Sequence, residues 1–372
     1  MTAFVSCGSN LEELLTQELK ALGISSTLGK RGVFVPQEMD AIYRINYESR
    51  LASRVLWPLV QAPCRDRQDL YKAALSIDWS RYISSLQTFA IDVAGAHPAF
   101  TNTLFAAMVV KDAICDHHRK KFGSRPNVDV KNPDVQLHLL LLPGKIILSF
   151  DTSGSPLYKR GYRIQTGIAP LQESLAAAVL QLAGLTSDDV FCDPFCGSGT
   201  FLIEAAMKMT NTPAGYFRQK WGFEKMPQFS ASAWKSYKES ADKKVTVLPP
   251  KKIFGSDLDR HAVVHSRDHV KRTGFAIEVA SGDAKKITPP PGITCVATNP
   301  PYGKRITADN PYADLGVFLS RCAPSKIAVL CASDAEITNV GIPLRRAKTL
   351  SNGGLEVSVY LQASEQKTQT SI

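Results

Sequence analysis

The sequence predicts an α/β protein, with an open and mostly parallel sheet in the C-terminal half and a smaller α+β region before it. Short apolar strands alternate with helices from about residue 165 onward. Two of these strands, at 189–193 and 252–257, end in an aspartate that precedes a turn and a helix. The N-terminal region instead carries two apolar runs, at 135–142 and 145–151, joined by Pro-Gly as in an antiparallel hairpin.

The N-terminal region begins with a strand, a helix and a second strand. Leucines recur at helical spacing from Leu11 to Leu22, and Gly23 ends this helix. Besides the hairpin, the expected strands are 3–7, 32–35, 55–60 and 89–94, and the expected helices are 11–22, 39–47, 70–74 and 101–122. We therefore divide this region into a segment at 1–50 and a second α+β block at 51–155.

The C-terminal region, 156–372, alternates strand and helix. The expected helices are 171–182, 200–209 and 260–273, and the expected strands are 189–193, 252–257, 277–279, 295–299, 327–331 and 357–361. The stretch 210–250 interrupts this alternation with aromatic residues interleaved with lysines. Such a pattern could form a stacking platform for nucleic acid. We favour a helical excursion in which Trp221 and Trp234 pack inward, and we leave the role of the lysines open.

Composition excludes several classes of protein. With 44% hydrophobic and 21% charged residues, the 372-residue chain can bury cores and is not disordered. No apolar run reaches the ~18–20 residues of a membrane span. The start of the chain carries no basic or long apolar leader, so we expect a cytoplasmic protein without membrane contact. Eight cysteines without a CxxC pair indicate reduced thiols and neither zinc nor another metal.

The chain is moderately basic. Its net charge of +10 divides evenly, with +5 on each side of residue 165. A basic balance favours a polyanionic partner, although solubility alone would also account for it. The excess is spread over both halves, so no basic tail carries it.

The first motif is Asp193-Pro194-Phe195-Cys196-Gly197-Ser198-Gly199-Thr200, in which a strand ends, a Gly-rich turn follows and a helix begins. Glycines let the backbone approach a ligand closely, and a helix N-terminus offers free N–H groups. The motif matches neither a Walker loop nor a G-x-G-x-x-G dinucleotide loop. An acid before the glycines suits a ligand with a cation, such as the amino group of S-adenosylmethionine. A plain strand-turn-helix junction is the alternative.

Two further acids follow later strands. Asp257, in Gly255-Ser256-Asp257-Leu258-Asp259, stands where an acid can accept both ribose hydroxyls of an adenosine. The alternative is a helix N-cap, which either Asp257 or Asp259 could be, and the two roles can coexist. Asp283, in Ser281-Gly282-Asp283-Ala284, has the spacing of an acid that accepts from an adenine amino group, although many turns read Gly-Asp.

The most specific motif is Asn299-Pro300-Pro301-Tyr302-Gly303, directly after a strand. Two prolines make a rigid loop with few donors, which leaves the Asn299 side-chain oxygen and the Pro300 carbonyl as acceptors. This arrangement suits the two hydrogens of an exocyclic amine on a nucleobase. Holding both hydrogens directs the nitrogen lone pair toward a methyl donor. Tyr302 offers a flat face on which an extruded base can stack.

Together these motifs resemble the amino-directed Rossmann-type S-adenosylmethionine methyltransferases, and more closely the THUMP-containing RNA guanine-N2 methyltransferases. That family includes a bacterial large-subunit ribosomal RNA enzyme and an archaeal transfer-RNA enzyme. Runs outside the motifs are also similar to the family: 157–163, 169–177, 221–224 and 352–354. The resemblance is strong from 155 to 361 and weaker before. It implies a ferredoxin-like segment at 1–50, a THUMP RNA-binding domain at 51–155 and a Rossmann-like methyltransferase domain at 156–372.

The resemblance also implies roles for individual residues. Those expected to bind S-adenosyl-L-methionine are Pro170, Glu173, Asp193, Phe195, Cys196, Gly197, Ser198, Gly199, Thr200, Asp257, Leu258, Asp283, Ala284 and Asn299. Those expected to hold the target base are Asn299, Pro300, Pro301 and Tyr302. Family members often have Met where Phe195 stands, a change that conserves size.

The implied reaction is methylation of guanine N2 in RNA, and in 23S ribosomal RNA in particular. Methyl transfer would be direct, so neither Cys192 nor Cys196 would act as a nucleophile. Because the chain ends after one methyltransferase domain, we expect only the guanine-N2 activity. The alternatives are an adenine-N6 methyltransferase of DNA or RNA, a transfer-RNA guanine-N2 methyltransferase, and an inactive RNA-binding or ribosome-assembly factor. The sequence identifies neither the target nucleotide nor the oligomeric state.

Overall fold

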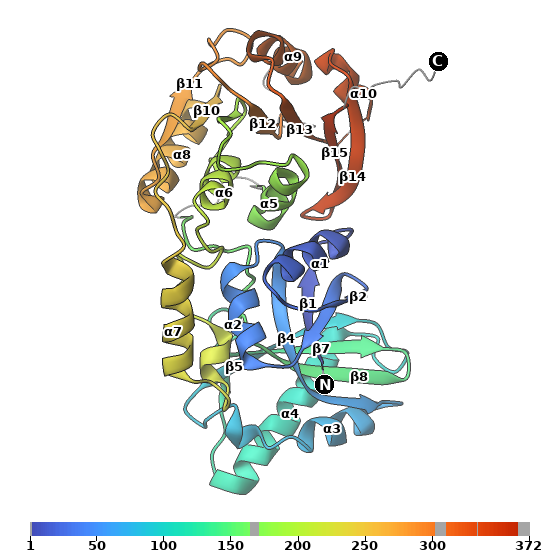
Figure 1. Cartoon of the computed structure of the whole chain (residues 1–372). Helices are drawn as coiled ribbons and strands as arrows, with labels where there is room; N and C mark the ends of the chain where they lie inside the picture. The colour runs from blue at the N-terminus through green and yellow to red at the C-terminus, as the bar shows by residue number, and fades with distance from the viewer. Residues whose placement is uncertain (1, 164–170, 302–309, 333, 364–372) are drawn as a thin grey trace, which may run out of the picture. The chain divides into compact units, whose positions relative to one another are not determined.

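The computed structural model describes residues 2–163, 171–301, 310–332 and 334–363 (Figure 1). The chain folds into two compact units. The N-terminal unit comprises 1–7, 12–159 and 218–240, and the C-terminal unit comprises 8–11, 160–217 and 241–372. Among the described residues, no helix is long and apolar enough to cross a membrane.

The N-terminal unit is built on one sheet with the strand order β2-β3-β1-β4-β8-β7-β5-β6. Its strands are β1 (Thr2–Cys7), β2 (Thr27–Gly29), β3 (Gly32–Pro36), β4 (Ala52–Pro63), β5 (Thr88–Gly95), β6 (Asn127–Val128), β7 (Val135–Leu142) and β8 (Lys145–Asp151). Its helices are α1 (Glu12–Ala21), α2 (Met39–Glu48), α3 (Arg67–Leu75), α4 (Thr103–Phe122) and α7 (Ala231–Asp242), with 3-10 turns at Trp79–Arg81 and Gly222–Lys225. The predicted hairpin 135–142/145–151 is confirmed, with Leu142 opposite Lys145.

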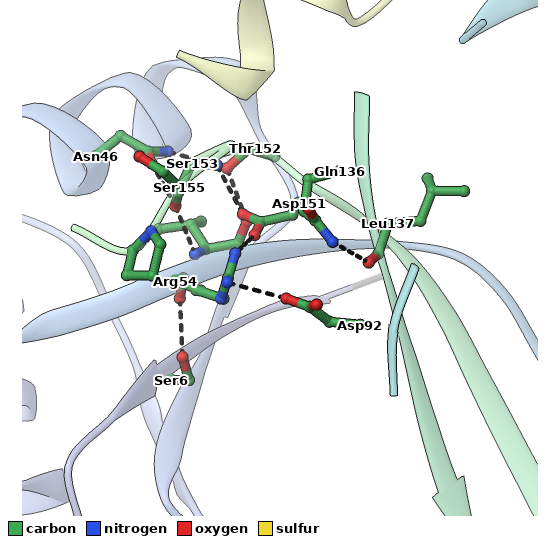
Figure 2. Close-up of polar contacts among 12 residues, drawn as sticks. Ser6, Asn46, Arg54, Asp92, Gln136, Leu137, Asp151, Thr152, Ser153 and Ser155 are labelled. Carbon is green, nitrogen blue, oxygen red and sulfur yellow. Dashed lines mark hydrogen bonds and ion pairs between the residues drawn. The ribbon is translucent and has the colours of Figure 1, made fainter. Parts of the chain in front are cut away.

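The long strand β4 joins the two predicted N-terminal segments into this single sheet. It pairs with β1 on one side and with β8 on the other. At this junction, Arg54 forms ion pairs with Asp151, which is buried, and with Asp92 at 3.0 Å (Figure 2). The amide of Asn46 is also fully engaged, because Nδ2 donates to Ile42 O and Thr152 Oγ1 and Oδ1 accepts from Ser153 Oγ. The buried polar groups of this junction therefore satisfy one another.

Residues 218–240 return to the N-terminal unit, although they follow 58 residues of the C-terminal one in sequence. The indole of Trp234 lies 5.5 Å from the ring of Tyr43 and 5.0 Å from that of Phe223, centroid to centroid. Trp221 and Phe223 are stacked at 5.6 Å. Both tryptophans are buried, so the interpretation of this stretch as an excursion with inward-packed aromatics is confirmed.

The C-terminal unit is an open α/β sheet with the order β11-β10-β9-β12-β13-β15-β14. Its strands are β9 (Phe191–Asp193), β10 (Ile253–Asp257), β11 (Ile277–Ser281), β12 (Cys295–Thr298), β13 (Lys326–Cys331), β14 (Leu344–Asn352) and β15 (Leu355–Gln362). Its helices are α5 (Glu173–Leu182), α6 (Thr200–Met209), α8 (Arg260–Thr273), α9 (Pro311–Cys322) and α10 (Asp334–Ile337), with a 3-10 turn at Thr338–Val340. The strands from β11 to β13 pair in parallel, and β15 and β14 are antiparallel, so the predicted α/β class is confirmed.

Both faces of the parallel strands are covered. Val296 of β12 and Val329 of β13 pack with Phe318 of α9 in one buried cluster. Because neighbouring residues of a strand point to opposite faces, Ala297 and Ala328 face the other side. Both alanines are fully buried. The sheet is therefore enclosed, and its open ends are the places for a ligand.

Candidate active site

Three of the predicted site residues meet at one edge of the C-terminal sheet. Asp257 ends β10, Asp193 ends β9, and Asn299 directly follows β12. These strands are neighbours and run in parallel, so their carboxyl ends lie side by side. In open α/β sheets, ligands bind outside this edge. The register thus brings together residues that lie up to 106 positions apart in sequence.

Asp193 is 1% exposed, and its carboxylate has polar but uncharged partners. Its Oδ1 accepts from Thr298 Oγ1 at 2.6 Å and from the Phe195 backbone N–H at 3.1 Å. It forms no ion pair with any residue that the structure describes. Burial raises the pKa of Asp193 to about 7, since no cation offsets the loss of water. A cationic ligand would supply the missing charge.

Asp257 fixes the Gly-rich loop to the adjacent strand. Its Oδ2 accepts from the Gly197 backbone N–H at 2.8 Å, and its Oδ1 accepts from the Asp259 N–H at 2.9 Å. Burial raises the pKa of Asp257 from its usual range. Of the two acids that the sequence offers as N-cap of the following helix, Asp259 takes the role, because its carboxylate accepts from His261 N.

The Gly-rich loop has a conformation that only small residues allow. Gly199 has a φ of +83°, and a Cβ there would lie 2.5 Å from Ser266 Oγ on α8. Gly197 has a φ of +51° with open space where a Cβ would stand. Cys196 is buried, and burial raises the pKa of its thiol well above the usual value. The same holds for Cys192, so both are thiols and neither is poised as a nucleophile.

Asn299 presents an unsatisfied acceptor at the same edge. Its Oδ1 is buried and has no hydrogen-bond partner within the described ranges. A buried amide oxygen without a donor costs free energy, which a ligand donor would recover. Pro300 is buried beside it, and Pro301 is half-buried. Tyr302, the fourth residue predicted to hold the base, lies outside the described residues.

The other predicted cofactor residues differ in how available they are. The Asp283 Oδ1 accepts from the Lys285 N–H at 3.1 Å, so its carboxylate caps its own turn. Gly282 N donates to the Asp257 carbonyl at 3.0 Å, which places this turn beside the end of β10. Leu258 is exposed, and Ala284 is buried. Phe195 packs against the core that includes α9. Pro170 lies outside the described residues.

Glu173, Ser198 and Thr200 converge on a residue that the motifs did not single out. Arg163 donates from Nε to Glu173 Oε1 at 2.5 Å, from Nη1 to Ser198 Oγ at 3.3 Å and from Nη2 to Thr200 Oγ1 at 2.7 Å. Arg160 and Glu204 form a second, fully buried ion pair nearby in the chain, at 3.3 Å. Arg163 ends the run 157–163, whose resemblance to the family assigns it no role.

The residues at this edge fit an S-adenosylmethionine-type cofactor. The test is the chemistry of the site itself: an uncompensated buried acid for a cation, a second acid one strand away, and a glycine loop with room at Gly197. Within the described residues, no group of three or more His, Cys, Asp or Glu side chains could hold a metal ion.

Comparisons with known proteins agree with this arrangement. The model of the RMKL-like methyltransferase domain matches residues 160–340, that of the THUMP domain matches 64–151, and that of the RlmL ferredoxin-like domain matches 2–56. The fold and the strand-end residues define a Rossmann-like methyltransferase domain. By its domain composition, the chain belongs with the RlmL-like, THUMP-containing methyltransferases.

Individual relatives extend over nearly the whole chain. Ribosomal RNA large subunit methyltransferase K/L of Vibrio campbellii is 35% identical over 373 residues, which are 95% of this chain and 52% of the relative. The chain thus spans about half the length of the curated relatives it matches. A protein from Clostridium difficile 630 described as a possible methylase has a TM-score of 0.85 at 25% identity, over 99% of each chain. The structure of SMU.472 with bound SAH has a TM-score of 0.84 at 24% identity, over 98% of each.

Proposed function

We propose that this protein transfers a methyl group from S-adenosyl-L-methionine to the exocyclic N2 of a guanine in RNA, with 23S ribosomal RNA as the substrate. The observation that carries the proposal is the buried Oδ1 of Asn299, which has no hydrogen-bond partner in the part of the chain that the structure describes and lies at the edge where Asp193 and Asp257 also end their strands. An acceptor held without a donor is prepared for a ligand that brings one.

Asn299 acts on the target amine. Its Oδ1 and the carbonyl of Pro300 accept the two N2 hydrogens, which draws the nitrogen lone pair out of the ring system and toward the methyl donor. The preceding Thr298 is fixed to Asp193 at 2.6 Å, so the acceptor is held by the same contact that orders the cofactor acid. The amine returns to neutrality by losing one proton to water after transfer. Fixed acceptors need no reorganisation during the reaction.

Asp193 and Asp257 act on the cofactor. When bound, S-adenosylmethionine supplies an activated methyl on a sulfonium. Asp193 would hold the amino group of its methionine part, because this carboxylate is buried without a cation among the described residues. Asp257 would accept from the ribose hydroxyls while its Oδ2 keeps Gly197 in place. The two neutral thiols in this region, Cys192 and Cys196, take no part in transfer.

The RNA substrate is supported by the N-terminal unit and by the charge. A THUMP domain occupies 64–151, and the net charge of +10 suits a polyanion. Curated relatives over 95% of this chain are named for the large-subunit ribosomal RNA. A cytoplasmic location suits an enzyme of that substrate.

Nucleoside mass spectrometry of 23S and transfer RNA tests this function in a strain that lacks the protein. We expect N2-methylguanosine to fall in 23S RNA and to return with the wild-type gene but not with Asn299→Ala. A fall of N2-methylguanosine in transfer RNA instead would identify transfer RNA as the substrate. A fall in N6-methyladenosine would favour an adenine methyltransferase. If no methylated nucleoside changes and the purified protein does not bind SAH, the alternative of an inactive RNA-binding factor would be favoured.

A further inference from the structure

Arg163 joins three segments around the Gly-rich loop. Its Nε contacts the carboxylate of Glu173 on α5, and its Nη2 donates to the Leu171 carbonyl at 2.8 Å. On the loop side, Nη1 donates to Ser198 Oγ and Nη2 to Thr200 Oγ1. The Arg163 side chain is 13% exposed and the Glu173 side chain 5%. All three guanidinium nitrogens thus form hydrogen bonds in a site that is largely shielded from solvent.

Helix α8 contacts the same loop through different atoms. His269 Nδ1 lies 3.1 Å from the Ser198 carbonyl, which can only accept, so Nδ1 carries the proton. Burial lowers the pKa of His269, which keeps the ring neutral. A Cβ added to Gly199 would lie 2.5 Å from Ser266 Oγ on this helix, so a side chain there would force one of the two to shift. Arg163 therefore hydrogen-bonds to the side chain of Ser198, and His269 hydrogen-bonds to its backbone carbonyl.

We infer that Arg163 is a positioning residue, whose planar guanidinium fixes the side chains of Ser198 and Thr200 and thereby holds the loop 193–200 in the shape that takes the cofactor. The inference rests on the proposed function only in assigning that loop to S-adenosylmethionine. A loop that is already ordered loses little conformational entropy on binding, which raises affinity. Arg163 itself touches neither the methyl group nor the base in this account.

The geometry requires an arginine. Three nitrogens in one plane reach Glu173, Ser198 and Thr200 in different directions. A lysine keeps the charge beside Glu173 but offers one nitrogen, so it cannot serve the loop and the carboxylate together. Arg163→Lys thus separates the fork from the charge. Arg267→Lys is a matched control, because Arg267 lies exposed on α8 and donates from Nε and Nη2 to the Val279 carbonyl.

The test is calorimetric titration of the full-length protein with SAH, followed by kinetics. We expect Arg163→Lys to weaken SAH affinity 10- to 100-fold and to raise KM for the methyl donor similarly. We expect kcat at saturating donor and RNA affinity to stay within about threefold. Arg267→Lys should leave all four quantities unchanged. If wild-type protein fails to bind SAH, the proposed function fails; if wild-type and Arg163→Lys bind SAH equally, the role of Arg163 fails.

A second variant, which removes one hydrogen bond of Arg163, keeps the inference testable if Arg163→Lys fails to fold. Thr200→Val deletes the acceptor of Arg163 Nη2 and should weaken SAH three- to tenfold. If Arg163 acts through Thr200, adding Thr200→Val to Arg163→Lys should cost less than the product of the two single effects. Strict multiplication of the two effects would overturn the inference. Faster amide hydrogen exchange at 195–200 in Arg163→Lys, with the melting temperature retained, would support it.

Discussion

Each unit of the molecule buries an aspartate at the end of a strand, and the two acids are treated in opposite ways. Asp151 ends β8 of the N-terminal unit and is paired with Arg54. Asp193 ends β9 of the C-terminal unit and has no cation among the described residues. Two asparagines repeat the contrast, because the amide of Asn46 is fully bonded while the buried Oδ1 of Asn299 has no hydrogen-bond partner among the described residues.

This difference separates structure from function. A buried polar group that is satisfied by its own chain stabilises a particular packing. A buried polar group that is left unsatisfied costs stability, and it persists where a ligand provides the missing partner. In the C-terminal unit, Asp193 without a cation and Asn299 Oδ1 without a hydrogen-bond partner, both among the described residues, lie at one sheet edge. The polar groups of the junction around Arg54 in the N-terminal unit satisfy one another.

The two asparagines give the largest expected contrast. Asn299→Ala should lower kcat at least about 1,000-fold, because it removes a fixed acceptor for the reacting amine. SAH affinity should stay within threefold by calorimetry. Asn46→Ala should leave kcat intact in a methylation assay but lower the melting temperature, since Thr152 Oγ1 loses a donor and the Ser153 hydroxyl loses its acceptor. Wild-type turnover by Asn299→Ala would refute the mechanism.

The two aspartates give the next contrast. Asp193→Asn should weaken SAH at least about 100-fold by calorimetry, because an amide cannot balance the ligand's charge. It should also raise stability above pH 7 by removing an uncompensated buried charge. Asp151→Asn should lower the free energy of unfolding by about 2 kcal/mol in urea titrations, since Arg54 loses its buried partner. Equal effects of the two variants on SAH affinity would break the comparison.

Salt should weaken the binding of RNA much more than the binding of SAH. If the +10 charge contacts RNA phosphates, RNA affinity should fall roughly 30-fold or more between 50 and 200 mM salt, through counterion release. SAH affinity depends on a few fixed groups and should change less than about twofold. Filter-binding titrations of RNA and calorimetry of SAH at both salt concentrations measure this. RNA binding that is insensitive to salt would reduce the net charge to a matter of solubility.

The pH dependence is smaller and has a definite sign. The pKa of Asp193 is raised to about 7, so the folded protein holds a proton that the unfolded chain releases near pH 4. The stability contribution of Asp193 is therefore lost as pH rises from about 4 to about 7. SAH needs the ionised acid, so its affinity should rise about tenfold from pH 6 to pH 8, with release of about one proton at pH 6. Proton release shows in calorimetry as a dependence on buffer ionisation enthalpy, which Asp193→Asn should abolish.

Most of the C-terminal fold could be predicted because each parallel strand is a continuous apolar run that ends in a recognisable motif. Strand β14 was not predicted, since its Leu344-Arg345-Arg346-Ala347-Lys348 reads as polar surface and becomes a strand only by pairing with β15 at the sheet edge. Helix α9 was also missed. Its start had a signal, because Asn310 caps it by accepting from Ala313 N and Pro311 occupies the first turn.

The candidate site was predictable where one motif carries one role and less so where contacts are long-range. Asp193, Asp257 and Asn299 follow from strand ends alone. The convergence of Arg163 on Ser198 and Thr200 depends on tertiary packing across 35 and 37 positions, which no local pattern encodes. The merging of the two N-terminal segments into one sheet through β4 and β8 is equally non-local.

The return of 218–240 to the N-terminal unit interlaces the two units along the chain, because the chain passes from one to the other at 7–8, 11–12, 159–160, 217–218 and 240–241. A gene fragment that stops at 159 would leave Tyr43 and Tyr47 without the rings of Trp221 and Trp234. A fragment that starts at 160 would carry those indoles into solvent. Splitting the gene at 159–160 would thus give two fragments that expose aromatic side chains. Keeping 218–240 with the N-terminal unit would leave these rings packed together.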